Sequence, residues 1–126
     1  MTIYALSTGP GLSGVAVIRV SGEESKRVIE LLTNKPLPAP RVASLRNISK
    51  INTLELIDEG IILWFPGPHS YTGEDMVEFH IHGSKAVIEA VHSSISKIDN
   101  CHLAEPGEFT KIAFQNGKIN LLKAES

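Results

Sequence analysis

The sequence predicts an α+β domain (α/β mixed), with a mixed β-sheet and flanking helices. Short apolar runs rich in β-branched residues, such as residues 15–20, alternate with stretches in which apolar residues recur at helical spacing. Strands and helices that alternate in this way belong to the α/β or α+β class. The length of 126 residues suits one compact domain with a core of its own.

Two strands are expected near the N-terminus, at residues 3–7 and 15–20. The turn between them, at residues 9–14, has the Gly-x-Gly-x-x-Gly spacing of a dinucleotide-binding fingerprint. That fingerprint requires a helix directly after it, whereas a strand follows here, and Pro10 removes an amide that could bind phosphate. We therefore interpret it as a tight turn. The sequence also contains no Gly-x-x-x-x-Gly-Lys-Ser/Thr run, so this chain alone is not expected to hydrolyse GTP or ATP.

A first helix is expected after Ser21, because Glu24 three residues later completes the spacing of a capping box. Asn34 is the expected stop of this helix. The apolar face of the helix is formed by Val28, Ile29, Leu31 and Leu32. Three prolines at positions 36, 38 and 40 then exclude helix from the connection, and residues 41–50 are expected to form a strand.

Two further strands, at residues 61–65 and 76–82, flank a long loop at residues 66–75. Long loops of specific composition often carry function. In the second strand apolar and polar residues alternate, which places them on opposite faces of a sheet. The apolar side consists of Val77, Phe79 and Ile81, and the polar side of Glu78, His80 and His82.

The last third of the chain predicts a helix, a short strand and another helix. Gly83-Ser84 begins the first helix, residues 102–104 form the strand, and residues 106–108 open a helix that Asn116-Gly117 closes. Asn120 could cap a fourth helix, but one or two turns are not stable alone. We therefore expect one domain over residues 1–119 and the start of a truncated helical domain over residues 120–126.

Composition excludes some function classes. The net charge of −2, without any run of lysine or arginine, argues against binding of a phosphate backbone by charge alone. No apolar segment is long enough to cross a bilayer. The single cysteine, Cys101, excludes a disulfide within the chain and favours a cytoplasmic location. We interpret Cys101 as a small strand or turn residue.

Three charged residues are candidates for ligand binding. Arg19 is expected at a strand end beside a helix N-terminus, where both groups favour an anion, although a simple salt bridge is equally possible. Glu78 lies on a central strand and could accept two parallel N–H groups of a pterin or amino-pyrimidine ring, or pair with a nearby lysine or arginine. Lys118 follows Asn116-Gly117, which is expected to end the last helix, and its side chain could reach an anion.

His80 and His82 stand two residues apart on one strand face and could share a metal, with Glu78 as a third ligand. Zinc sites need three or four protein ligands, and nothing in the sequence supplies the remaining ones. We therefore predict a polar strand face and no metal site.

Six segments, in this order, carry a resemblance to one protein family. They are residues 14–22 (GVAVIRVSG), 58–60, 65–75 (FPGPHSYTGED), 78–83 (EFHIHG), 106–110 and 114–120. With them, nearly the whole chain resembles the N-terminal domain of the MnmE (TrmE) family. The resemblance implies a fold like the tetrahydrofolate-binding domain of aminomethyltransferases, a homodimer formed through this domain, and a cytoplasmic or organellar location.

The resemblance also implies a function. Members of the family are GTPases that, with the flavin-dependent partner MnmG, modify C5 of the wobble uridine of certain tRNAs. This domain would bind a tetrahydrofolate derivative, either 5-formyltetrahydrofolate or 5,10-methylenetetrahydrofolate. The matched motifs place the folate contacts at Arg19, Glu78 and Lys118 and imply no catalytic residue in this chain. GTP, Mg²⁺ and K⁺ would bind only to the GTPase domain, which this sequence lacks. The tRNA would be only an indirect partner of this domain.

Tyr71, Phe79 and Phe114 could support the folate ring or fill the core, and for the last two we expect the core. The chain departs from the family at Ser84, where a second glycine is common, and at Leu12, where many members carry a basic residue. Two alternatives stay open: a structural dimer module without ligand, and a free-standing one-carbon transferase that uses Glu78 or His80 as acid or base.

Overall fold

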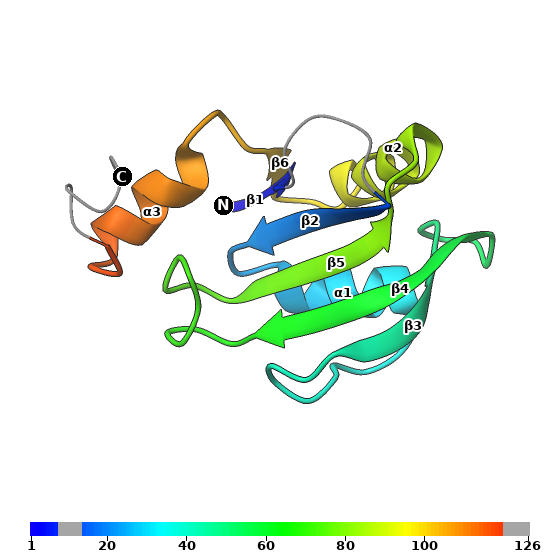
Figure 1. The fold of residues 1–126 in the computed structure, drawn as a ribbon, viewed down its shortest axis with the longest axis horizontal. Coiled ribbons are helices and arrows are strands. Elements are labelled where there is room, and N and C mark those ends of the chain that lie inside the picture. Colours follow the sequence, from blue (N-terminus) through cyan, green and yellow to red (C-terminus); the bar gives the residue numbers. More distant parts are fainter. Residues whose placement is uncertain (8–13, 120–126) are drawn as a thin grey trace.

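A computed structural model describes residues 1–7 and 14–119 of the chain. Within these residues six strands form one sheet, and three helices accompany it (Figure 1). The strands are β1 (Thr2–Leu6), β2 (Val15–Ser21), β3 (Ser44–Ser49), β4 (Leu56–Phe65), β5 (Met76–His82) and β6 (Cys101–Leu103). The helices are α1 (Ser25–Thr33), α2 (Lys85–Ser96) and α3 (Glu108–Gln115).

The strands lie in the order β3-β4-β5-β2-β1-β6. All neighbouring pairs are antiparallel except β1 and β6, which run parallel. The sheet is therefore mixed, and the predicted α+β class is confirmed. Strands β2 and β5 lie at the centre, each paired along its whole length.

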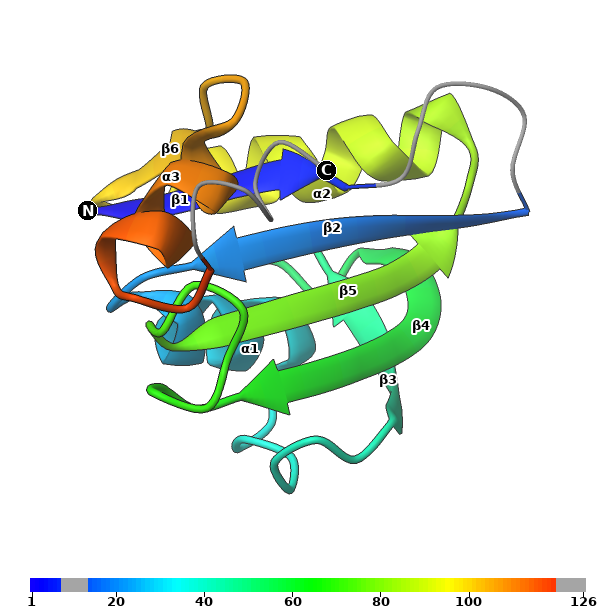
Figure 2. The same cartoon turned by 60° about the vertical axis from the view of Figure 1, so that its left-hand side comes forward.

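Helices α1 and α2 cover one face of the sheet (Figure 2). Their buried residues, among them Val28, Leu32 and Val91, join one apolar cluster with Ile18 of β2 and Phe79 of β5. The predicted alternation of β5 is confirmed, since Val77, Phe79 and Ile81 are buried in this cluster. On the opposite face, none of the described helices lies over the middle, and we call it the open face. Its central side chains are Val15, Val17 and Arg19 of β2, Ile61 and Leu63 of β4, and Glu78, His80 and His82 of β5.

The capping box predicted for α1 is wrong. Ser21 is the last residue of β2, and its hydroxyl group is bonded to Thr72 and Glu74 of the long loop instead of to the helix. Glu24 occupies the N-cap position without a side-chain cap, while its amide donates to Oγ1 of Thr2 at 2.9 Å. The stop at Asn34 is confirmed, because this residue caps the helix in the left-handed conformation.

Other element boundaries follow the sequence with few differences. Strand β4 begins at Leu56, five residues before the predicted start, because residues 56–60 pair with β3. Ser84 caps α2 by accepting a hydrogen bond from the amide of Val87 at 3.1 Å. Asn116 and Gly117 end α3 as predicted. The glycine-rich turn over residues 9–13 and the helix proposed from Asn120 lie outside the described residues.

Cys101 is a buried residue of β6, which confirms its interpretation as a small strand residue. Burial raises the pKa of its thiol to about 11, so that the thiolate is scarce at neutral pH.

The two phenylalanines expected in the core differ in burial. Phe79 is fully buried, but Phe114 is 46% exposed on α3, so its assignment to the core is wrong. Helix α3 lies at one end of the sheet, and only Ala113 of its residues is buried.

This difference between the two phenylalanines has a measurable consequence for stability. The substitution Phe79→Ala should lower the free energy of unfolding by about 3 to 5 kcal/mol, because it leaves a cavity in the centre of the core. The matched substitution Phe114→Ala should change it by less than about 1 kcal/mol. Urea unfolding followed by circular dichroism measures both values. Equal losses in the two variants would contradict the assignment of the core.

Candidate functional site

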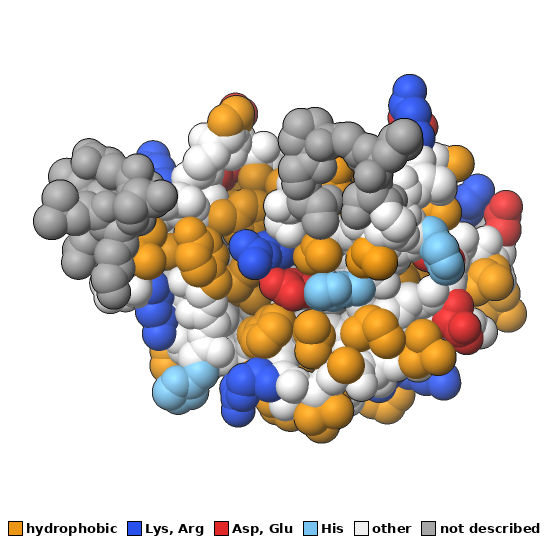
Figure 3. Space-filling view, viewed as in Figure 1, with side chains coloured by type: hydrophobic (Ala, Val, Ile, Leu, Met, Phe, Trp, Pro, Cys, Tyr) orange, Lys and Arg blue, Asp and Glu red, His pale blue; other side chains and the backbone are white. Residues whose placement is uncertain are grey.

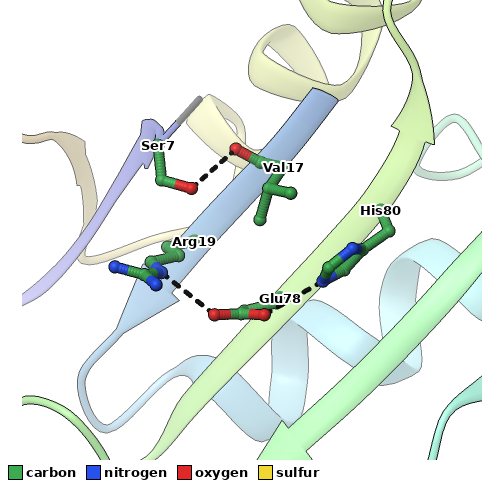
Figure 4. A network of polar contacts seen from close by, with 5 residues as sticks. All are labelled: Ser7, Val17, Arg19, Glu78 and His80. Carbon is green, nitrogen blue, oxygen red and sulfur yellow. Dashed lines mark hydrogen bonds and ion pairs between the residues drawn. The ribbon is translucent and has the colours of Figure 1, made fainter. Parts of the chain in front are cut away.

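The centre of the open face carries an ion pair between Arg19 and Glu78 (Figure 4). The register of β2 and β5 places these two residues directly opposite each other. Nε of Arg19 donates to Oε2 of Glu78 at 3.0 Å. The Glu78 side chain is 16% exposed and that of Arg19 is 36% exposed. The antiparallel register is thus the direct cause of the pair, since side chains opposite each other on one face are neighbours.

His80 approaches the other oxygen of the same carboxylate. Its Nε2 lies 3.0 Å from Oε1 of Glu78 (Figure 4). The two residues are two apart on β5 and therefore share a face. Because a carboxylate only accepts hydrogen bonds, Nε2 is the donor. Glu78 is held at both oxygens, by Arg19 on one side and by His80 on the other.

The long loop at residues 66–75 brings Tyr71 to the ion pair. The guanidinium carbon of Arg19 lies 5.6 Å from the centre of the Tyr71 ring, a distance typical of a cation–π contact. The loop is held in place by Thr72, which is fully buried and whose Oγ1 lies 2.7 Å from Oγ of Ser21. Ser21, at the end of β2, therefore fixes the position of the loop next to Arg19.

Helix α3 and the turn after it pack against the same loop (Figure 2). Nδ2 of Asn116 donates to the carbonyl of Thr72 at 2.8 Å, and the hydroxyl groups of Tyr71 and Thr110 lie 3.2 Å apart. Lys118 follows in this turn, and its amide donates to the carbonyl of Ala113. Its side chain lies beside Gly73 of the loop.

The structure therefore brings together two of the three predicted ligand contacts. Arg19 and Glu78 form a pair, which is also the alternative that the sequence left open for both residues. Among the described residues, Lys118 makes no ion pair with either of them. Its side chain lies beside Gly73, in the loop that also carries Tyr71. Arg19 is the fifth residue of β2 and does not share a site with a helix N-terminus, since α1 covers the opposite face. That part of the prediction is wrong.

Apolar side chains surround this polar row. Figure 3 shows basic, acidic and histidine side chains crossing a face that is otherwise largely apolar. Beside His80 the face is hollowed to about 330 Å³, and the hollow includes Val15, Leu45, Ile61 and His82 in its walls. The open face thus combines an apolar hollow with a carboxylate and a guanidinium. Such a surface suits a flat ring system that carries N–H donors and, elsewhere, a negative charge.

The GTP-binding protein TrmE N-terminus family model matches residues 2–118. The chain belongs to this family. It is 79% identical over all of its 126 residues to the tRNA modification GTPase MnmE of Pelagibacter ubique (strain HTCC1062), and it spans 28% of that protein. It is 53% identical over 124 residues to the mitochondrial 5-taurinomethyluridine-[tRNA] synthase subunit GTPB3 of Danio rerio, of which it spans 25%. The chain thus covers only about a quarter of the length of these curated relatives.

This member of the TrmE N-terminal family has a second histidine–carboxylate pair, which the sequence did not reveal. Nδ1 of His82 lies 2.8 Å and 3.0 Å from the two oxygens of Asp58, and its amide donates to Oδ2 at 2.8 Å. The partners are 24 residues apart, so no short motif could predict the contact. The contact between Glu78 and His80 could have been predicted, because residues two apart on a strand are neighbours on one face.

His80 and His82 of this TrmE-family chain thus contact different carboxylates, those of Glu78 and Asp58. Within residues 1–7 and 14–119, no group of three histidine, cysteine or acidic side chains is placed to hold a metal ion. None of the helices described there is both long and apolar enough to cross a membrane.

The pair between Asp58 and His82 makes stability depend on pH. Burial by itself raises the pKa of Asp58, but hydrogen bonds from the His82 amide and ring and from the Glu59 amide, with the charge of His82, outweigh it. The pKa therefore lies below its usual value of 3.8. A lowered pKa in the folded state stabilises the fold fully above about pH 4, and this contribution is lost as the pH falls through the folded value.

The substitution Asp58→Asn should accordingly lower the free energy of unfolding by about 1 kcal/mol at pH 7, because a charge-assisted hydrogen bond is lost. The difference from the wild type should shrink as the pH falls below about 4. Denaturant unfolding at pH 7, 5 and 3 measures it, with Asp99→Asn, at an exposed turn position, as the matched control. A difference that stays constant over this pH range would disprove the role of the Asp58 carboxylate.

Proposed function

We propose that this chain is the folate-binding and homodimerisation domain of a tRNA modification GTPase. Its site would bind a tetrahydrofolate derivative, either 5-formyltetrahydrofolate or 5,10-methylenetetrahydrofolate. The observation that carries the proposal is the carboxylate of Glu78, fixed at both oxygens in the middle of an open, largely apolar sheet face.

The chemistry of Glu78 matches the amino edge of a reduced pterin. Each carboxylate oxygen can accept about two hydrogen bonds, and the described contacts use one on each oxygen. One acceptor position is therefore left on each, which is what two parallel N–H donors of a pterin ring require. The apolar side chains around the hollow, such as Val15 and Ile61, offer a surface for the flat ring.

The two cations support the rest of the ligand. Arg19 contacts Glu78 through Nε, and its terminal amino groups enter no ion pair with another described residue. They are suited to a carbonyl or carboxylate of the ligand, since arginine binds such groups with two parallel N–H bonds. Lys118 lies beside the same loop as Tyr71 and would serve a more distant negative charge, such as the glutamate tail.

The activity of the whole protein is part of the same proposal. The relatives of this chain are named as tRNA modification enzymes. We propose that the complete protein takes part in that modification at C5 of the wobble uridine, together with the flavin-dependent partner MnmG. GTP hydrolysis with Mg²⁺ and K⁺ would belong to a separate GTPase domain.

Calorimetric titration with 5-formyltetrahydrofolate tests the proposal. The wild-type chain should bind it saturably. The double variant Arg19→Ala, Glu78→Ala should lose about a hundredfold or more in affinity, because two charged contacts are removed. Lys118→Ala should weaken binding more than Lys111→Ala, which removes the same charge from the exposed side of α3.

The control for the double variant is Arg27→Ala, Glu89→Ala. It removes the same charges from exposed positions of α1 and α2, on the far side of the sheet. No binding by a folded wild type would contradict the folate proposal and favour a structural dimer module. Transfer of a one-carbon unit from 5,10-methylenetetrahydrofolate to an amine would favour the free-standing transferase.

Sedimentation velocity of the same samples tests the homodimer. A chain that sediments only as a monomer would contradict it.

A further inference from the structure

We propose that His80 is a positioning residue for Glu78: it fixes the rotation of the carboxylate so that both oxygens present an acceptor to the ligand at once. This inference rests on the proposed folate-binding function. It concerns a side chain that contacts the carboxylate and also lines the apolar hollow next to it.

The need for a second contact follows from the side chain of glutamate. The last torsion angle of glutamate is broad, so a carboxylate held at one oxygen can still turn about its axis. Arg19 supplies one such contact, from Nε to Oε2. Nε2 of His80 supplies the second, at 3.0 Å from Oε1. With both contacts present the plane of the carboxylate is defined, and two parallel N–H donors can meet it without an entropic cost of ordering.

His80 is itself held firmly. Its neighbours across the sheet are Val17 on β2 and Ile61 on β4, both apolar, so neither competes for its ring nitrogens. Its backbone lies against Gly60 of β4, where a Cβ atom would stand only 2.5 Å from the carbonyl oxygen of His80. The absence of a side chain at Gly60 thus lets the two strands approach closely at this point. The His80 side chain is 30% exposed, which leaves one edge of the ring accessible to a ligand in the hollow.

The contact also defines the tautomer of His80. Since the carboxylate can only accept, the neutral ring must carry its proton on Nε2, and Nδ1 is then an acceptor. Among the described residues, the titratable groups near His80 and Glu78 at this face include Arg19, beside Glu78, and Tyr71, against Arg19, as well as His82 and Glu59, which line the same hollow. His82 lies four residues beyond Glu78 on β5, and its ring contacts Asp58 instead.

The test compares His80→Leu, which removes the donor, with His80→Gln, which keeps an N–H donor on a side chain of similar reach. The affinity for 5-formyltetrahydrofolate should fall about tenfold in His80→Leu, since a bond to a charged group is lost. It should return to within about threefold of the wild type in His80→Gln. The control His102→Leu makes the same exchange at an exposed position of β6 and should leave the affinity unchanged. Thermal unfolding of each variant shows that it is folded.

The outcomes separate this inference from the proposed function. Wild-type binding with unchanged affinity in His80→Leu would overturn the role of His80 alone. Equal losses in His80→Leu and His80→Gln would also overturn it, because ring packing and not the donor would then matter. A wild type that binds no folate would overturn the proposed function and this role together.

A second measurement does not depend on ligand binding or on a variant that might unfold. Long-range ¹H–¹⁵N correlation spectra of the ligand-free chain report which ring nitrogen of a neutral histidine carries the proton. We expect His80 as the Nε2–H tautomer. A predominance of the Nδ1–H tautomer would show that Glu78 is not its partner, and would overturn the inference.

Discussion

The register between β2 and β5 is the constraint on which the site depends. It places Arg19 opposite Glu78 and Val17 opposite His80, with their side chains on the face that α1 and α2 leave open. If either strand shifted its register by one residue, its side chains would change faces. Its open-face residues would then point into the core, and its buried residue, Ile18 of β2 or Phe79 of β5, would point outward. The same core packing that stabilises the fold therefore also orients the charged row.

The ion pair itself contributes little to stability. A partly exposed pair is worth roughly 0 to 1 kcal/mol, and a cation–π contact such as that of Arg19 with Tyr71 about 0.5 to 1 kcal/mol. A buried phenylalanine such as Phe79 is worth several times more. The row of Arg19, Glu78 and His80, with Tyr71 of the loop against Arg19, therefore adds little to folding, and this supports the proposed role in ligand recognition. The loop contributes through Thr72, which links Ser21 of β2 to Asn116 after α3.

Local signals in the sequence predicted most elements and the face that Glu78 occupies. Period-two alternation identified β5, and the helix stops at Asn34 and Asn116 were found from residue type alone. Contacts between residues far apart in the sequence could not be predicted from such local signals. Ser21 has the spacing of a cap but bonds to a loop 51 residues away, and Asp58 meets His82 without any local pattern. Phe114 is apolar and periodic, yet it is an exposed residue of a helix that lies at one end of the sheet.

A crystal structure of the chain with bound 5-formyltetrahydrofolate tests the central claim most directly, namely that the Glu78 carboxylate on the open face recognises the ligand. The account predicts the amino edge of the pterin within hydrogen-bonding distance of both oxygens of Glu78, with the contacts from Arg19 and His80 retained. A ligand that binds elsewhere, and leaves Glu78 in contact only with Arg19 and His80, would contradict it.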